Sequence, residues 1–138
     1  QEPLEALVAE CAGMRETPIE AMDHFIERWL GLLANDRKYR QSFEILLNKT
    51  ELTEAMQSTL ERERRLTQSM IETLEALVCS AQEQGRIPQG HAAGQLALMI
   101  YTQLMGVTQT WLFAPGLFDL GEQRGFFAER LLRSLQQP

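Results

Sequence analysis

The stretch WLFAPGLFDLGEQ, from Trp111 to Gln123, sets five large apolar side chains around a Pro-Gly pair and follows them with acidic residues. Proline and glycine are the residues that most often interrupt a helix and turn the chain. Asp119 with Glu122 three residues later is the pattern of a helix N-terminus, with Asp119 as the N-cap. The stretch therefore predicts a hairpin of two helices. The side chains expected to hold these helices together are Trp111, Phe113, Leu117 and Phe118.

The predicted helix before this corner, from about Gln89 to Phe113, has no charged face. No Asp, Glu, Lys or Arg occurs from Gly90 through Phe118, and a helix without a charged face is usually covered on all sides. One domain of 138 residues can hardly cover both sides, so we expect a second subunit to contact one of them. The alternative is a central helix wrapped by its own chain. The inward side is expected to carry Ala97, Tyr101, Leu104, Thr108 and Trp111. The side toward the second subunit is expected to carry Leu96, Met99, Gln103, Gly106 and Thr110.

The rest of the chain repeats apolar residues at the spacing of amphipathic helices. Thr17, Pro18 and Glu20 match a capping box with the favoured proline at the first helical position. Gly85 followed by Pro88 is a helix stop. No strand pattern or repeat occurs, so we predict an all-α fold: a helical bundle of about six helices in a single domain. The helices are expected before Gly13, from Thr17 to Asn35, around 39–47, from about Thr53 to Gln84, from about Gln89 to Phe113, and after Asp119.

The composition disfavours several classes of protein. The formal net charge is −6, and an acidic chain without a basic stripe is a poor candidate for binding nucleic acid by itself. No run reaches the roughly 18 to 20 apolar residues of a membrane span, and no signal-peptide pattern is visible. Cys11 and Cys79 are too few for a disulfide framework. We therefore expect a cytoplasmic protein with free thiols and no membrane partner.

Residue patterns that carry catalytic or metal chemistry are missing. His24 and His91 are the only histidines, and neither has a second His or Cys three or four residues away. There is no Gly-rich phosphate loop and no nucleophile elbow. We therefore predict no catalytic residues, no metal and no cofactor, and an enzyme is the least favoured class. Met and aromatic residues on the inward helix faces leave two interpretations open, a filled core or an apolar cavity that small molecules enter.

Three segments together resemble a known family. They are Glu44-Ile45-Leu46 with Lys49 and Glu51, then Gly85-Arg86-Ile87-Pro88, and finally Trp111-Leu112-Phe113-Ala114-Pro115 with Phe118-Asp119-Leu120. On these motifs the chain resembles the C-terminal regulatory domain of TetR-type transcriptional repressors, and within that family the AcrR branch, which controls multidrug efflux pumps. The likeness spans essentially all 138 residues. Thr50 and Leu52 depart from the branch, where Cys and Phe are common.

The resemblance implies that residues 1–138 are a single C-terminal regulatory domain, and that the family's N-terminal helix-turn-helix domain is absent from this chain. DNA would then be contacted only through that missing domain. The resemblance also implies a homodimer, in which the last two helices form a four-helix bundle with those of a second subunit. The residues that it places in the dimer interface are Leu96, Met99, Gln103, Gly106, Thr110, Phe127 and Leu131.

The resemblance further implies a ligand cavity inside the bundle. Tyr101 and Thr108 lie seven residues apart, on the same face of a helix, and are expected to anchor a polar end of the ligand. The leading interpretation is a sensor whose apolar or amphipathic ligands relieve repression of multidrug efflux genes. The alternative is a plain dimerisation or protein-interaction module with no ligand pocket. The ligand-binding positions are Met22, Phe25, Ile26, Trp29, Phe43, Leu47, Met70, Leu74, Tyr101, Leu104, Met105 and Thr108.

Overall fold

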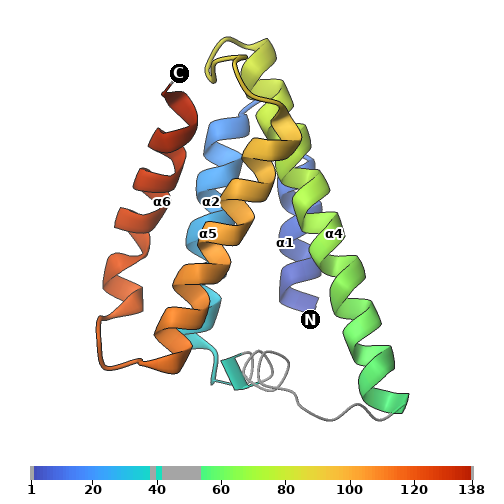
Figure 1. The fold of residues 1–138 in the computed structure, drawn as a ribbon, viewed down its shortest axis with the longest axis vertical. Coiled ribbons are helices and arrows are strands. Elements are labelled where there is room, and N and C mark those ends of the chain that lie inside the picture. The colour runs from blue at the N-terminus through green and yellow to red at the C-terminus, as the bar shows by residue number, and fades with distance from the viewer. Residues whose placement is uncertain (1, 38–39, 42–53, 138) are drawn as a thin grey trace.

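The computed structural model describes residues 2–37, 40–41 and 54–137 as an all-α bundle (Figure 1). The sixth expected helix, around 39–47, falls mostly outside these residues, although Arg37, Arg40 and Gln41 have helical backbone. The described part therefore holds five long helices rather than about six. Their bounds are α1 (Glu2–Ala12), α2 (Pro18–Asn35), α4 (Glu54–Glu83), α5 (Ala93–Phe113) and α6 (Leu120–Gln136).

The helix α2 is the centre of the bundle. It contacts α6, α4, α1 and α5, and in Figure 1 it lies behind α5, between α6 and α4. Its buried face is almost wholly apolar, because aromatic and aliphatic side chains recur along it at helical spacing. The residues of α2 that are buried are Pro18, Ala21, Met22, Phe25, Ile26, Trp29, Leu30, Gly31, Leu32 and Leu33.

Two of the predicted helix ends are confirmed. The carboxylate of Asp119 accepts a hydrogen bond from the Glu122 backbone N–H at 3.0 Å, so Asp119 is the N-cap of α6. Gly85 ends α4 with a φ of +76°, a conformation that glycine adopts without strain. The N–H of Arg86 reaches the Ala81 carbonyl at 2.8 Å, and the N–H of Gly85 reaches the Gln82 carbonyl at 3.1 Å. These two bonds form a Schellman motif, which satisfies the last carbonyls of the helix.

Two other helix starts differ from the prediction. The side chain of Thr17 makes no capping hydrogen bond at the start of α2, although Pro18 is at the first turn. Glu20, the other half of the predicted capping box, pairs instead with Arg86 at 3.1 Å. The helix α5 begins at Ala93 rather than near Gln89, because the amide of Gln82 binds the carbonyls of Pro88 and His91 and holds the preceding loop.

The corner between α5 and α6 is more open than predicted. Trp111 is buried, and Phe118 stacks edge-on against Phe127 at a centroid distance of 5.9 Å. Phe113 and Leu117, however, are 92% and 70% exposed, so the prediction that they tie the helices together is wrong. The physical reason is that α6 packs mainly against α2 and much less against α5. The turn therefore bridges two separated helices, and Phe113 and Leu117 are left exposed.

Candidate functional site

The predicted ligand residues of α2 and α5 meet around Trp29. The side chain of Trp29 has no solvent exposure, and its indole N–H donates to the Thr108 hydroxyl at 3.0 Å. Phe25 and Tyr101 flank the indole, each with its ring centroid 6.0 Å away, Tyr101 in an edge-on arrangement. These four side chains, Phe25, Trp29, Tyr101 and Thr108, form the Trp29 cluster.

Both predicted polar anchors already have partners within the chain. Thr108 donates to the Leu104 carbonyl at 2.8 Å while accepting from Trp29. The Tyr101 hydroxyl lies 3.3 Å from the Thr67 hydroxyl of α4. Burial raises the pKa of Tyr101 above its usual value, so the phenol stays protonated and keeps its donor. A ligand that uses either hydroxyl must therefore share or replace one of these hydrogen bonds.

The other predicted ligand positions are mostly buried in the same core. Met105 is half-buried, and Phe43 and Leu47 lie outside the described residues. Assignment of these twelve positions to ligand binding stays a prediction. The positions that the structure places in the buried core are Met22, Phe25, Ile26, Trp29, Met70, Leu74, Tyr101, Leu104 and Thr108.

A pocket that the sequence analysis did not anticipate lies at the C-terminal end of α5. It has a volume of about 280 Å³ and is lined by Arg40, Trp111, Leu112 and Pro115. The guanidinium carbon of Arg40 sits over the Trp111 ring, 5.3 Å from its centroid. We call this the Arg40–Trp111 pocket. Sequence reasoning missed it because no motif links an arginine to a tryptophan 71 positions later in the chain.

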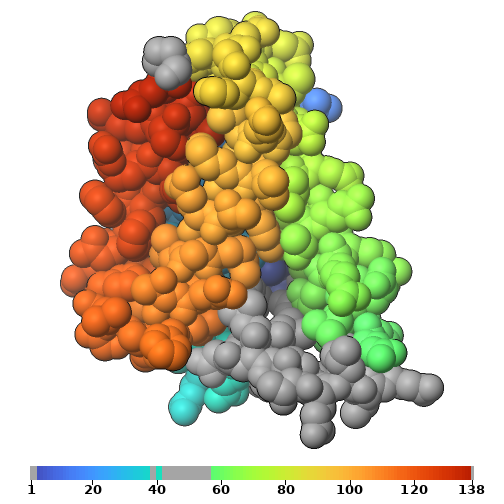
Figure 2. Space-filling model, in the orientation of Figure 1, coloured from blue at the N-terminus to red at the C-terminus, as the bar shows by residue number. Residues whose placement is uncertain are grey.

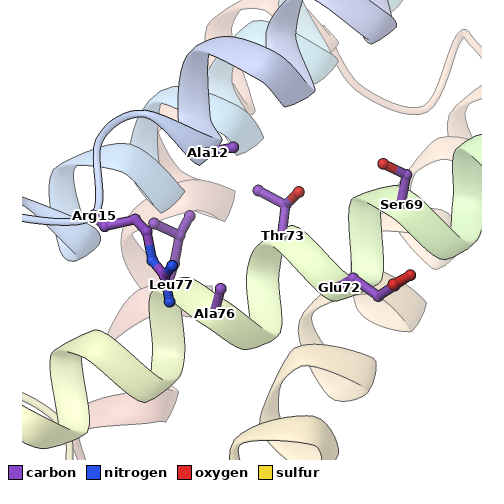
Figure 3. A pocket seen from close by; sticks show the side chains of 7 residues that line it. All are labelled: Ala12, Arg15, Ser69, Glu72, Thr73, Ala76 and Leu77. Atoms are coloured by element: carbon purple, nitrogen blue, oxygen red, sulfur yellow. The ribbon is translucent and has the colours of Figure 1, made fainter.

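A shallower groove separates the end of α1 from α4 (Figure 3). Its volume is about 200 Å³. Small side chains line part of the groove, with Ser69 and Thr73 of α4 on the side toward α1, and Arg15 lies just after the end of α1. Among the described residues, Arg15 and Glu72 of this groove form no ion pair. The residues that line the groove are Ala12, Arg15, Ser69, Glu72, Thr73, Ala76 and Leu77.

The outward side of α5 is open in the single chain. Figure 2 shows it along the front of the molecule, between α6 and α4. Of the predicted dimer residues, Gln103, Gly106 and Thr110 are exposed, and nothing lies within 4 Å of a Cβ added at Gly106. The described helices therefore do not wrap α5 on all sides. The remaining predicted dimer residues are half-buried or buried within the chain itself, and they are Leu96, Met99, Phe127 and Leu131.

Two further apolar side chains of these helices are exposed. Leu98 of α5 and Phe126 of α6 are 51% and 57% exposed. A hollow of about 300 Å³ lies between the start of α5 and the end of α6, with Leu96 and Met99 in its lining. We define the outer face as the exposed side of α5 together with Phe126 and this hollow. No charged side chain of α5 interrupts it, since α5 has none.

The described residues contain no cluster of three His, Cys, Asp or Glu side chains that could hold a metal ion. None of the described helices combines the length and the hydropathy that crossing a membrane requires.

Comparison with known proteins identifies relatives of this domain. Residues 17–137 match the family described as the C-terminal region of MAATS-type transcriptional repressors. The fold is similar to NalD of Pseudomonas aeruginosa, the secondary repressor of the MexAB-OprM multidrug efflux pump, with 23% sequence identity and a TM-score of 0.81 over 98% of this chain and 67% of that one. A second NalD structure gives 24% identity and a TM-score of 0.82, over 98% and 68% of the two chains.

The repressor SmeT of the Stenotrophomonas maltophilia multidrug efflux pump SmeDEF is also similar. Its TM-score is 0.73 at 18% identity, over 97% of this chain and 65% of that chain. A comparison with curated protein sequences finds no match. At these identities the solved structures establish the fold.

Proposed function

The chain belongs to the TetR family, as the C-terminal region of a MAATS-type transcriptional repressor, and on this premise we propose that it is the ligand-sensing and dimerisation domain of a cytoplasmic repressor of multidrug efflux genes. Its ligands are apolar or amphipathic small molecules that relieve repression. DNA is contacted through a helix-turn-helix domain on the N-terminal side of α1, as in the family that the chain resembles.

The observation that carries the ligand-sensing proposal is the Trp29 cluster. It places two hydrogen-bonding hydroxyls, Tyr101 and Thr108, among aromatic side chains in an otherwise apolar core. Small-molecule sites typically combine an apolar lining with a few polar groups in this way. The hydrogen bonds also join three helices, because Trp29 is on α2, Thr108 on α5 and Thr67 on α4. A ligand that replaces one bond shifts these helices relative to one another.

A conformational change at the Trp29 cluster would reach the DNA-binding domain through α1. That helix contacts both α2 and α4. His24 of α2 binds Glu10 of α1 at 2.8 Å, and the Cys11 thiol lies 3.6 Å from the Ala21 carbonyl. Movement of α2 or α4 therefore moves α1, which leads to the DNA-binding domain. The ligand changes the balance between repressing and inactive conformations only by its difference in affinity for the two.

Dimerisation is supported by the outer face. Exposed apolar side chains grouped on one face of a domain mark interaction surfaces. The outer face contains Leu98 and Phe126, and α5 supplies no charge that a partner helix must desolvate. Gly106 leaves room for a close approach of a second helix.

The test of ligand sensing is a thermal-shift screen of dyes, antibiotics and plant phenolics against this 138-residue chain. Burying about 400 Å² of apolar surface contributes roughly 10 kcal/mol, and immobilising the ligand takes back several of these, so we expect affinities that are about micromolar. Hits should change the fluorescence of Trp29 in a Trp111→Phe variant, which isolates that signal. A screen that moves neither the melting temperature nor the Trp29 signal would leave only the alternative below.

The alternative is a dimerisation module with a filled core. It is favoured by the absence of any solvent exposure at Met22, Phe25 and Trp29. In that case the Trp29 cluster is only a buried hydrogen-bond network, and the outer face is the sole functional surface. The two candidates differ in whether any small molecule stabilises the chain.

A further inference from the structure

In the Arg40–Trp111 pocket, the arginine side chain is stacked on an aromatic ring. Arg40 follows the end of α2, and its backbone N–H binds the Asp36 carbonyl at 3.0 Å, which continues one helical turn past α2. This turn carries the guanidinium over the face of Trp111, a side chain that is only 8% exposed. Stacking on an indole holds a guanidinium in place through the negative charge of the ring face.

The stack on Trp111 uses a face of the guanidinium and not its edge, which carries the hydrogen-bond donors. Its five N–H donors lie in the plane of the group and point away from its faces. Among the described residues, no carboxylate forms an ion pair with Arg40. Asp36, one turn earlier, is engaged in an interaction of its own. A fixed, planar donor edge is the geometry that binds a carboxylate with two parallel hydrogen bonds.

The other residues that line the pocket determine which kind of carboxylic acid fits it. Leu112 and Pro115 are apolar, and Arg40 is the one formal charge among the described residues that line the pocket. The chain from Gly90 to Phe118 adds no carboxylate that would repel an anion. The volume of about 280 Å³ is near the lower end of the range of small-molecule sites, about 300 to 1,000 Å³. The pocket thus combines one anion-binding group with an apolar wall.

We propose that the Arg40–Trp111 pocket binds the carboxylate end of an amphipathic organic acid, whose apolar body lies against Leu112 and Pro115. This assignment rests on the proposed sensor function and names one chemical class of its ligands. Trp111 is one helical turn beyond Thr108 on α5. An acid bound to Arg40 therefore holds the end of α5 to the turn that follows α2, next to the Trp29 cluster.

The test compares an acid with its neutral counterpart on the unmodified chain. Naphthalene-2-carboxylate and naphthalene-2-carboxamide share size and apolar surface, and titration calorimetry gives their dissociation constants. We expect the carboxylate to bind at least tenfold more tightly, which corresponds to about 1.4 kcal/mol. Because the protein has two tryptophans, nitrogen–proton NMR shows two indole signals. The carboxylate should shift that of Trp111, identified by its loss in a Trp111→Phe variant.

Substitutions then locate the charge that matters. Arg40→Gln should remove the preference for the acid, and Arg40→Lys should keep only part of it, since lysine lacks the planar fork. Arg37→Gln is the matched control, because Arg37 is exposed, lies one turn away and is not in the pocket lining. It should leave both dissociation constants unchanged. Equal binding of acid and amide, or full binding of the acid by Arg40→Gln, would overturn the proposal.

The same samples also test the proposed sensor function separately, through the indole signal of Trp29. Neutral hits from the thermal-shift screen should shift the Trp29 indole signal in both the unmodified chain and Arg40→Gln. Equal binding of acid and amide by the unmodified chain, with this Trp29 response intact, refutes the assignment of the Arg40–Trp111 pocket alone. An Arg40-dependent acid site without any response at Trp29 refutes the proposed sensing by the Trp29 cluster alone.

Discussion

Replacing Thr108 by valine tests the hydrogen bond at the centre of the Trp29 cluster. Valine keeps the shape of threonine but removes the hydroxyl that accepts from the Trp29 indole at 3.0 Å. Neither side chain has any solvent exposure, so water cannot replace the lost acceptor. A buried donor left without a partner costs about 1 to 3 kcal/mol. We therefore expect Thr108→Val to lower the free energy of unfolding by about 2 kcal/mol, equivalent to about 6 to 10 °C in melting temperature.

Thr102→Val is the matched control. Thr102 is on the same helix, and its hydroxyl also donates to a carbonyl of the preceding turn, that of Met99 at 3.1 Å. Its side chain is exposed and accepts no buried hydrogen bond, so this substitution should change the stability by less than about 0.5 kcal/mol. Urea unfolding followed by circular dichroism measures both variants. The protein concentration must be the same in each series, because dimerisation makes stability depend on it.

A double-mutant cycle with Trp29→Phe isolates the bond itself. In a background without the indole N–H, Thr108→Val has no donor to orphan and should cost much less. The coupling energy between the two positions should therefore reach about 1 kcal/mol or more. Equal costs for Thr108→Val and Thr102→Val, together with a coupling energy near zero, would refute the reasoning and remove the polar element from the Trp29 cluster.

Three further outcomes follow from the structure. Gly106→Arg places a charge on the outer face and should convert dimer to monomer or aggregate in sedimentation experiments, while an unchanged dimer would place the interface elsewhere. Burial raises the pKa of the Cys11 thiol to about 11, so a thiol reagent at about pH 8 should label exposed Cys79 in the folded chain and leave Cys11 unmodified; rapid labelling of both would contradict the packing. The pKa of Glu20 is lowered by a hydrogen bond from its own backbone and by Arg86. The stability that this carboxylate contributes is therefore present above its pKa in the unfolded chain, and it is lost as the pH falls through its pKa in the folded chain. Because the pair is about half exposed, Glu20→Gln should cost less than about 1 kcal/mol at neutral pH and nothing in acid, a difference that urea unfolding at both pH values would reveal.

The sequence predicted helix ends correctly where the residue at the end of the helix is one that mainly serves as a helix stop or an N-cap. Gly85 ends α4 with a positive φ, and Asp119 caps α6 through its own carboxylate. The pattern at Thr17 is equally typical of a helix start, yet its hydroxyl makes no cap. The Glu20 carboxylate binds its own backbone N–H and Arg86, which lies 66 residues further along the chain, while the Thr17 N–H binds the Met14 carbonyl at 3.1 Å. A capping pattern shows where a helix begins, but not whether the predicted side chain binds the first backbone N–H groups.

The candidate site could be predicted only in part. Helical spacing brought Trp29, Tyr101 and Thr108 to the inward faces of their helices, which the structure confirms. Spacing could not show that these groups would bind one another, since that depends on how α2 and α5 are placed. Arg40 was missed for the same reason. Its partner Trp111 was interpreted as part of the corner, while the helix packing turns its ring toward the end of α2.

The packing of α6 on α2 also connects the ligand site that we propose with the proposed contact between subunits. The outer face includes Phe126 of α6, and the other side of α6 rests on the helix that carries Trp29. A subunit contact through α6 would be one helix away from the Trp29 cluster of each protomer, so a ligand bound at one cluster would alter how tightly the protomers associate. Linkage requires the reverse effect to be equally large. Diluting the protein below its dimer dissociation constant should therefore change the affinity for ligand, and the two sites of one dimer should bind with a cooperativity that disappears in Gly106→Arg.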